Sequence, residues 1–216
     1  MITSNFTGRD IVFINNNIIF KATNVGMKSK TELEIASLEV FKEVKEMANT
    51  HENLSSRKIK SWQSKFSDKT TTLEKTAQLE ILIQNLNSGL NEIGENQSLL
   101  KVVTLISKTI YNFEKLQPFE EANGLIARML GNYVAIYSNM PIIVFYPDDK
   151  RVYNLAISRD NSEEFTRFIA KKIKEVAYDY MGDICDLVKT NPNSGIYQHP
   201  ATAKKMIVEW HELNRL

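Results

Sequence analysis

Apolar residues recur every three or four positions along most of this chain, and few helix-breaking residues interrupt them. Its 216 residues include only eight glycines and five prolines. Because an α-helix turns once in about 3.6 residues, such apolar positions fall on one helical face. The spacing therefore predicts a mainly α fold. The expected helices cover residues 31–49, 55–66, 73–93, 98–116, 123–136, 150–158, 162–189 and 200–214.

The chain divides into three expected segments. In residues 1–30, apolar runs at 11–14 and 18–20 flank three asparagines, a pattern consistent with a short β-hairpin. Residues 31–190 carry the long helical patterns and form the expected domain. Residues 191–216 contain a linker of Asn, Pro, Ser and Gly, then a helix that either docks on the domain or pairs with another subunit.

Charge and cysteine content argue against several classes of protein. The formal net charge is +1, so no strong overall field draws the chain to nucleic acid or to a membrane surface. No apolar run approaches the roughly 20 residues that span a bilayer. Cys185 is the single cysteine, which suits a reducing compartment. The N-terminal residues lack the features of a secretory signal peptide. We expect a cytoplasmic protein, and export by a signal-independent route, as bacterial effectors use, stays open.

Chemistry-bearing residues concentrate between two predicted helices, in residues 117–128. Pro118 ends the first helix, because a proline disfavours the helical conformation at the residue before it. Asn123 and Gly124 open the second helix. The free N–H groups and the dipole of a helix N-terminus favour a bound anion. The segment is therefore suited to hold a phosphate.

Two charged residues flank this expected anion site. Glu121 lies one turn before the helix and carries a carboxylate that suits a hard divalent cation. Arg128 lies one turn into the helix and has the length to reach back to a phosphate oxygen. The same residues also fit an ordinary capped helix start with solvated acids and a surface ion pair. Physical chemistry alone leaves both interpretations open.

Residues 117–128 read QPFEEANGLIAR and resemble the signature of the Fic (Fido) family, commonly written His-Pro-Phe-x-x-Gly-Asn-Gly-Arg-x-x-Arg. The long apolar helix before the motif, residues 145–156 and residues 164–169 also resemble the family's flanking segments. The positions that match the signature in register are Pro118, Phe119, Asn123, Gly124 and Arg128.

This resemblance implies a helical Fic domain and the family's chemistry, in which AMP moves from ATP to a Ser, Thr or Tyr hydroxyl of a target protein. It implies that Asn123, Gly124 and Arg128 bind the nucleotide phosphates and that Glu121 holds Mg²⁺. Tyr153 takes the place of an aromatic residue that helps to form the adenine pocket. The implied ligands are ATP with Mg²⁺ and a protein partner, without nucleic acid or membrane.

Three positions of the motif differ from the family signature, and each of them bears on the family's chemistry. Gln117 replaces the His that acts as general base, Ala122 replaces the first Gly, and Leu125 replaces the first Arg. A glutamine amide does not titrate near neutral pH. Losing a general base costs about 10²–10⁴-fold in rate. Leu125 also removes a cation that would neutralise charge on the phosphates.

Two further elements of the family have no counterpart in the sequence. Fic enzymes carry a β-hairpin flap that aligns the target backbone, but only about six residues connect the helices that should flank it here, which is typical of a plain loop. The family's autoinhibitory motif, Ser/Thr-x-x-x-Glu followed by Gly or Asn, has no clean match. The usual target-docking edge is therefore expected to be missing.

Three functions remain open on this basis. We favour a degenerate Fic protein, impaired as an AMP-transferase, that binds a partner, a nucleotide or both. The alternative is an active transferase with altered chemistry, in which Gln117 orients a substrate and another group accepts the proton. The third is an interaction module in which the Asn-Gly pair survives only as a helix start.

Overall fold

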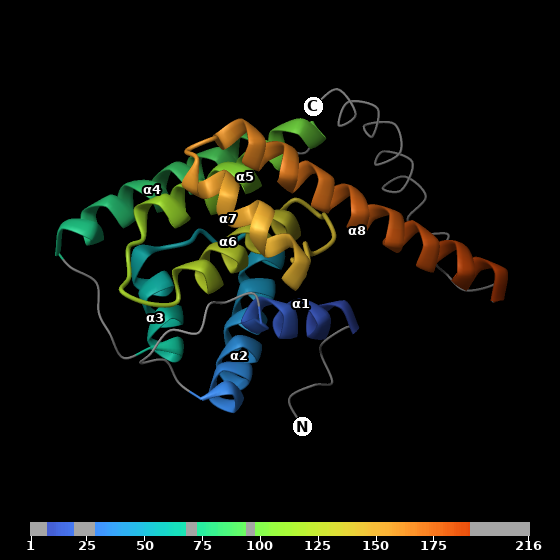
Figure 1. The fold of residues 1–216 in the computed structure, drawn as a ribbon, viewed down its shortest axis with the longest axis horizontal. Helices are drawn as coiled ribbons and strands as arrows, with labels where there is room; N and C mark the ends of the chain where they lie inside the picture. The colour runs from blue at the N-terminus through green and yellow to red at the C-terminus, as the bar shows by residue number, and fades with distance from the viewer. Residues whose placement is uncertain (1–7, 20–28, 68–72, 94–97, 191–216) are drawn as a thin grey trace.

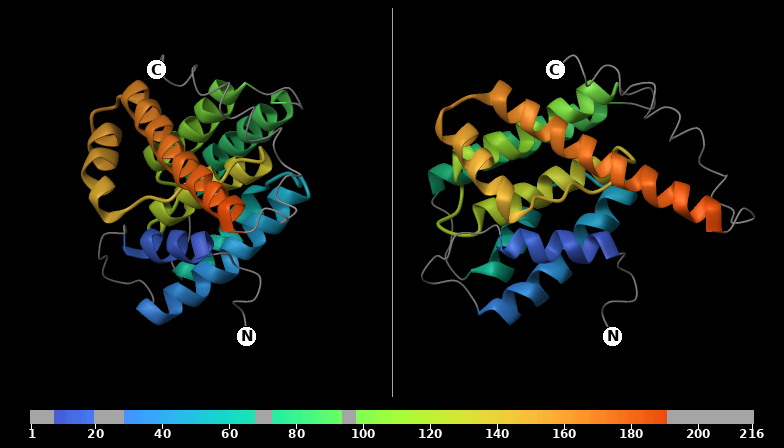
Figure 2. Two further views of the ribbon diagram at one scale, coloured as in Figure 1. Left: turned by 90° about the vertical axis from the view of Figure 1, so that its right-hand side faces the viewer. Right: turned by 45° about the vertical axis from the view of Figure 1, so that its right-hand side comes forward.

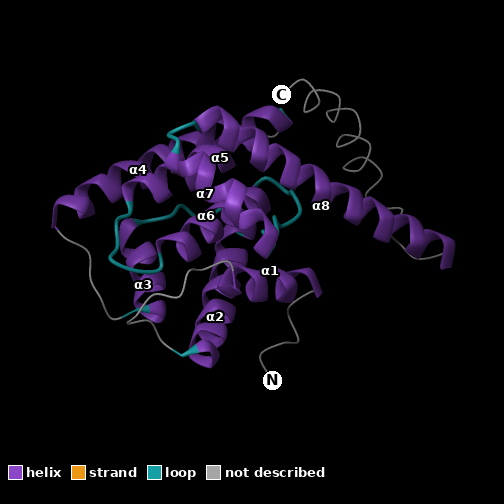
Figure 3. Cartoon of the chain, in the orientation of Figure 1, coloured by secondary structure: helices purple, strands orange, loops and turns teal. Residues whose placement is uncertain are grey.

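The computed structural model of the protein describes residues 8–19, 29–67, 73–93 and 98–190. These residues fold into eight α-helices and one short 3-10 helix, and no strand occurs among them (Figures 1 and 3). The predicted mainly α class is confirmed. In chain order the elements are α1 (Gly8–Ile19), α2 (Lys30–Asn49), α3 (Ser56–Phe66), α4 (Leu73–Glu92), α5 (Leu99–Leu116), α6 (Asn123–Tyr137), η2 (Pro147–Asp149), α7 (Lys150–Ser158) and α8 (Ser162–Thr190).

Helix α6 is the centre of the fold, and twelve of its fifteen residues are buried. Helices α5, α2, α1 and α3 contact it. In the views of Figure 2, α1 and α2 lie on one side of α6 and α8 lies on the other. Helix α8 packs on α5 and α7, and α4 packs on the opposite flank of α5. The motif predicted between two helices therefore lies at the head of the most enclosed helix.

Gly131 lets α5 and α6 approach closely. A Cβ atom at this position would lie 2.5 Å from Cδ1 and 2.7 Å from Cγ1 of Ile110 on α5. Both distances are shorter than carbon atoms tolerate, so the contact between the two helices requires a residue without a side chain here. Ile110 itself is fully buried.

The hairpin considered for residues 11–20 is wrong, because residues 8–19 form helix α1; Phe20 lies outside the described residues. The apolar residues face the core at helical spacing, with the rings of Phe13 and Phe41 centred 4.7 Å apart. Asp10, in the first turn, forms a 2.7 Å ion pair with Lys45 of α2. The asparagine triplet does not turn the chain, since the amide of Asn16 donates to the carbonyl oxygen of Val12 one turn earlier. Packing against α2 thus outweighs the turn propensity of the asparagines.

Serines stand at the N-cap positions of α3 and α5, and only one of them makes a capping hydrogen bond. Ser55 precedes α3 and accepts a hydrogen bond from the backbone N–H of Lys58, as an N-cap does. Ser98 occupies the N-cap position of α5, yet its side chain makes no capping hydrogen bond. The start of α5 is fixed instead by burial of Leu99 and Val102.

Residues 142–145 form a buried segment without regular secondary structure, which pairs with no strand among the described residues. Asn132 of α6 takes the place of a strand partner. Its Oδ1 accepts from the N–H of Ile143 at 2.6 Å, and its Nδ2 donates to the carbonyl oxygen of Ile143 at 3.0 Å. This buried segment is thus held to α6 by one side chain and not by a neighbouring strand.

Two predictions concern segments near the limits of the described residues. Helix α3 ends at Phe66 and α4 begins at Leu73, so the six-residue connection has the predicted length, although 68–72 themselves lie outside the described residues. The linker and helix predicted in 191–216 also lie outside them. None of the described helices combines the length and apolar character needed to cross a membrane.

Glu43 connects α2 to α3, and its ionisation should make folding sensitive to acid. Its carboxylate accepts from Nε1 of the buried Trp62 at 2.9 Å and forms ion pairs with Lys58 and Lys65. Burial raises the pKa of Glu43, but hydrogen bonds from Trp62, Lys65 and Lys58 outweigh burial and leave that pKa lowered from 4.5. A lowered folded-state pKa stabilises the fold above pH 4.5, and this contribution is lost as the pH falls through the folded value.

We expect Glu43→Gln to lower the free energy of unfolding by about 1 kcal/mol at pH 7, because charged hydrogen bonds are weakened. Urea unfolding at pH 7, 5, 4 and 3 measures this. The difference between wild type and variant should shrink below pH 4.5. A difference that is constant with pH would contradict the role assigned to the charge. Glu46→Gln on the same helix is the matched control, because the Glu46 carboxylate is exposed and lies 3.8 Å from Lys42.

Candidate functional site

The motif turn is set by two residues in the left-handed region. Gln117 ends α5 with φ of 45° and ψ of 59°, and its N–H donates to the carbonyl oxygen of Phe113. Ala122 precedes α6 with φ of 66° and ψ of 10°. This conformation favours glycine, which accounts for the glycine that the family signature has where this chain has Ala122. Ala122 thus holds a left-handed backbone without the conformational freedom of a glycine.

Asn123 closes the turn from inside. Its Oδ1 accepts from the N–H of Phe119 at 3.0 Å, and its Nδ2 donates to the carbonyl oxygen of Phe119 at 2.7 Å and to Oε1 of Gln117 at 3.1 Å. The side chain is 5% exposed. The amide predicted to bind phosphate is thus engaged in holding the turn.

Gln117 bridges the two ends of the turn. Its Nε2 donates to the backbone carbonyl oxygen of Glu114 at 2.7 Å and to Oε2 of the same residue at 3.0 Å. Its own backbone carbonyl oxygen accepts from Nζ of Lys75, on α4, at 2.8 Å. An amide can donate and accept at the same time without titrating. Gln117 therefore links Glu114 to Asn123 where the family has a base.

Glu114 is the residue of this site that sequence analysis missed. Its Oε1 accepts from the Tyr153 hydroxyl at 2.7 Å and lies 3.9 Å from Nη1 of Arg128. The same oxygen is 3.1 Å from the position that a Cβ on Gly124 would take. The carboxylate thus lies against the second residue of α6, where the sequence predicts an anion site. The spacing of Glu114 and Gln117, three residues apart on one helix, was the available signal.

Arg128 is enclosed by the N-terminal helix α1. Its Nε donates to Oδ1 of Asn17, and its Nη2 donates to the backbone carbonyl oxygen of Asn17 at 3.2 Å. The guanidinium carbon lies 5.8 Å from the centre of the Tyr153 ring. Only 3% of the Arg128 side chain is exposed. No local pattern foretells this contact, since the two residues are 111 positions apart.

Tyr153 belongs to an aromatic cluster in the core. Its ring centre lies 5.2 Å from that of Phe165, 5.8 Å from Phe145 and 6.2 Å from Phe168. Burial raises the pKa of the Tyr153 hydroxyl far above its usual value, and the negative charge of Glu114 adds to the effect. The ring predicted to form an adenine pocket is 2% exposed.

Glu121 and Leu125, the remaining motif positions with predicted consequences, also face inward. Glu121 is 4% exposed and accepts from the Ser67 hydroxyl at 2.7 Å. Leu125 is fully buried in the core. Among the described residues, no three or more His, Cys, Asp or Glu side chains gather as a metal site would require. Glu121 is thus placed beside the end of α3 without a described cluster of metal-type ligands around it.

The comparisons with known proteins agree with the resemblance of the motif to the Fic family. Residues 31–135, just under half of the chain, match the sequence model of the Fic/DOC family. This part of the chain is thus similar in sequence to Fic domains. Among solved structures, a Fic domain containing signalling protein from Bacteroides thetaiotaomicron is similar to 80% of this chain and 87% of its own, with a TM-score of 0.56 and 15% identity. A fragment of Fic-1 from C. elegans is similar over 86% of this chain and 69% of its own, with a TM-score of 0.63 and 13% identity.

These structural similarities establish the fold, and at such identity they establish nothing about activity. Among curated proteins, none matches the chain in sequence. The Fic-type fold predicted from the motif is confirmed. The roles of Asn123, Gly124, Arg128 and Tyr153 in binding ATP and of Glu121 in binding Mg²⁺ stay predictions. The loss of the catalytic base at Gln117 also stays a prediction.

The geometry does not fit a bound Mg-nucleotide. The family cofactor would need Arg128 and the head of α6 for its phosphates, but Glu114 and Asn17 contact these groups. It would need an aromatic face for its base, and Tyr153 is packed in the core. We therefore derive no catalytic step through ATP at this site.

Ala122 offers a direct test of the turn geometry. An alanine in the left-handed region carries about 1–2 kcal/mol of strain, while glycine loses about 0.5–1 kcal/mol more than alanine in ordering its backbone. We expect Ala122→Gly to raise the free energy of unfolding by about 0.5 kcal/mol. Urea denaturation measures this, with Ala127→Gly inside α6 as the control that should destabilise. If Ala122→Gly lowered the free energy of unfolding, the strain assigned to the left-handed backbone of Ala122 would be refuted.

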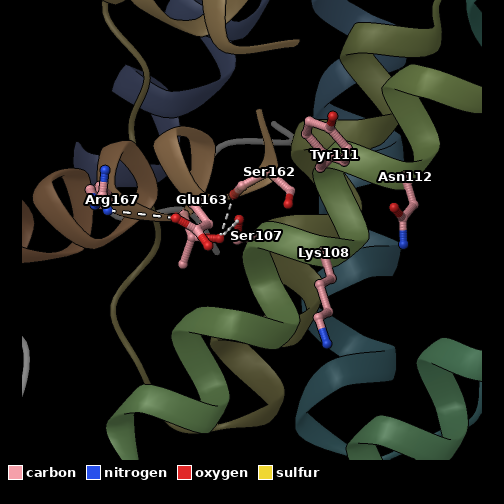
Figure 4. Close-up of a pocket in the computed structure, with 8 residues that line it drawn as sticks. Ser107, Lys108, Tyr111, Asn112, Ser162, Glu163 and Arg167 are labelled. Carbon is pink, nitrogen blue, oxygen red and sulfur yellow. Dashed lines mark hydrogen bonds and ion pairs between the residues drawn. The ribbon is translucent and has the colours of Figure 1, made fainter. Parts of the chain in front are cut away.

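Two surface grooves lie outside the motif. The larger one has a volume of about 740 Å³ and runs between α5 and the start of α8 (Figure 4). Polar and charged side chains line it, among them Lys108, Asn112, Glu163 and Arg167. A smaller groove of about 370 Å³ lies on the other flank of α5, against α4. No residue of 117–128 lines either groove.

Proposed function

We propose that this protein is a Fic-type protein that transfers no AMP and acts by binding a protein partner. The observation that carries the proposal is the closed network of the motif, in which Gln117, Asn123, Glu114, Arg128 and Asn17 are hydrogen-bonded or ion-paired with one another. A catalytic site must keep such groups available for substrate.

The replacement of the base supports the same conclusion. Gln117 cannot accept a proton from a target hydroxyl near neutral pH. Nζ of Lys75 donates a hydrogen bond to the Gln117 carbonyl oxygen, so this amine is not placed as a base either. At this turn, AMP transfer of the family type would therefore lack a general base and would lack phosphate-binding groups that are open to a nucleotide.

The first test is a transfer assay. Purified protein, a cell lysate as the source of targets, and ATP labelled at the α-phosphate are incubated together, with an active Fic enzyme as positive control. We expect no label above background for wild type. Gln117→His should also stay inactive, because restoring a base leaves Glu114 and Asn17 on the phosphate-binding groups. Labelling by wild type that disappears in Asn123→Ala would refute the proposal and support the active alternative.

Calorimetric titration with Mg-ATP tests the state of the anion site separately. Wild type should show no saturable binding below millimolar concentration. Glu114→Gln removes the internal negative charge next to Arg128 and should tighten binding by about tenfold, equivalent to about 1.4 kcal/mol. Glu120→Gln, in the same turn but exposed, is the matched control. Micromolar binding by wild type would mean that the network opens for a nucleotide.

A further inference from the structure

The α4–α5 groove presents apolar side chains to solvent. Leu82 and Leu86 of α4 and Leu105 and Leu116 of α5 line it. Ile81 also lines it and is 58% exposed, the highest value among the large exposed hydrophobic residues of the described chain. Burying one such side chain contributes about 1.5–3 kcal/mol. A partner that covers Ile81 therefore gains binding energy that the isolated chain leaves unused.

The groove has the dimensions of a helix docking site. On α5, the lining residues Leu105, Lys108, Asn112 and Leu116 recur every three or four positions. Their span of about 11 residues corresponds to about 16 Å of helix, or three turns. Two packed helices offer a groove between their ridges, and an added helix fills it with residues at the same spacing. The volume of about 370 Å³ suits the apolar ridge of such a helix.

The charged residues around the groove indicate the charge of a partner that would fit it. Lys108 is the one charged residue among those that line the α4–α5 groove. It also lines the larger groove across α5, together with Arg167 (Figure 4). Lys101 is exposed one heptad earlier on the same helix, and Lys115 one heptad later is paired with Asp160. Among the residues that line the two grooves, the one acid is Glu163, on the far side of α5, and it pairs with Arg167.

We propose that the α4–α5 groove binds an acidic amphipathic helix of a partner protein. Apolar residues at i, i+3, i+4 and i+7 of that helix contact Ile81 and Leu105, and flanking Glu or Asp residues face Lys108 and Lys101. This rests on the proposed partner-binding function and names the class of partner.

Two other occupants match the charge less well. A second copy of the chain, paired groove to groove, would bring its own Lys108 close to Lys108, and like charges across an interface cost binding energy. The chain's own residues 200–214 contain two lysines and two glutamates and carry no net acidity. An acidic helix complements the groove better than either.

The test uses the full-length protein and two synthetic helical peptides of about 18 residues, long enough to cover the groove. Both carry leucines at i, i+3, i+4 and i+7, and one has Glu and the other Lys at all flanking positions. The Ile81 methyl signal in NMR spectra reports occupancy. The Glu peptide should shift this signal saturably and bind at least about tenfold more tightly than the Lys peptide. Lys108→Glu should reverse the order, and Ile81→Lys, followed through the methyl signals of Leu105 in the same groove, should weaken both.

Val152→Lys is the matched control, since Val152 is 46% exposed on α7, outside the groove, and its change should leave binding unaltered. Equal affinity for the two peptides, or no shift up to millimolar peptide, would overturn the proposal. An Ile81 signal that changes on dilution would overturn it by assigning the groove to a second copy. An Ile81 signal that changes in the Trp210→Ala variant would also overturn the proposal, because the C-terminal segment would then occupy the groove. If the peptides do not bind as expected, the result of the AMP-transfer assay is unaffected. If the protein transfers AMP, the measured peptide binding is unaffected.

Discussion

Replacing Arg128 with methionine should lower the free energy of unfolding by about 3 kcal/mol, because removing one partner of a buried charged pair leaves the other charge buried without compensation. Here the methionine side chain would leave the nearby carboxylate of Glu114 and both oxygens of Asn17 without the guanidinium that contacts them. Urea unfolding followed by circular dichroism measures the loss. A decrease below about 1 kcal/mol would show that Arg128 is dispensable to the fold.

A second variant separates the charge effect from the loss of packing. Arg128→Met combined with Glu114→Gln removes the cation and the carboxylate together. Residues in direct contact show coupling energies of about 0.5–3 kcal/mol. We therefore expect the double variant to be less destabilised than the sum of the two single changes. Arg167→Met is the control on α8, because its side chain is 61% exposed and its change should cost less than about 0.5 kcal/mol.

Gly131→Ala should destabilise the protein by about 1–3 kcal/mol, the usual cost of overpacking a core. The added methyl group would meet Ile110 at 2.5 Å, where α5 and α6 are fully enclosed. The better helix propensity of alanine, worth about 1 kcal/mol, offsets only part of this. Thermal and urea unfolding measure the change. An unaltered stability would mean that the two helices separate freely.

Two matched variants sharpen this prediction. Gly89→Ala places its methyl group against Leu105, whose side chain is only partly buried and can move, so this change should be close to neutral. Ile110→Val removes the Cδ1 atom that obstructs residue 131 and alone costs about 0.5–1.5 kcal/mol. Combined with Gly131→Ala, it should cost less than the two changes added together.

Sequence periodicity predicted the helices well where packing and local propensity agree. The apolar spacing predicted a helix over residues 55–66, and α3 forms there with Trp62 fully buried and Ser55 as its N-cap. The turn between α5 and α6 followed from Pro118. The N-terminal segment failed because Asn16 and Asn17 are turn residues by propensity, whereas contacts with α2 and α6 hold them in a helix. Tertiary packing overrides propensity in such short segments.

The site itself was predictable only in part. The motif located Asn123, Gly124 and Arg128 at one turn, and the structure places them there. That Asn17 encloses Arg128 depends on residues 111 positions apart, which no local pattern connects. Tyr153 packs among Phe145, Phe165 and Phe168, so its environment likewise depends on separate segments of the chain coming together. Availability of a side chain, unlike its identity, is a property of the whole fold.

The side chain of Asn123 has a consequence for how such proteins are recognised in genomes. It joins Phe119 and Gln117 at the start of a helix that most of the fold surrounds. Pro-Phe and Asn-Gly therefore contribute to forming this turn whether or not the chain transfers AMP. For this reason the presence of these four residues does not by itself report activity.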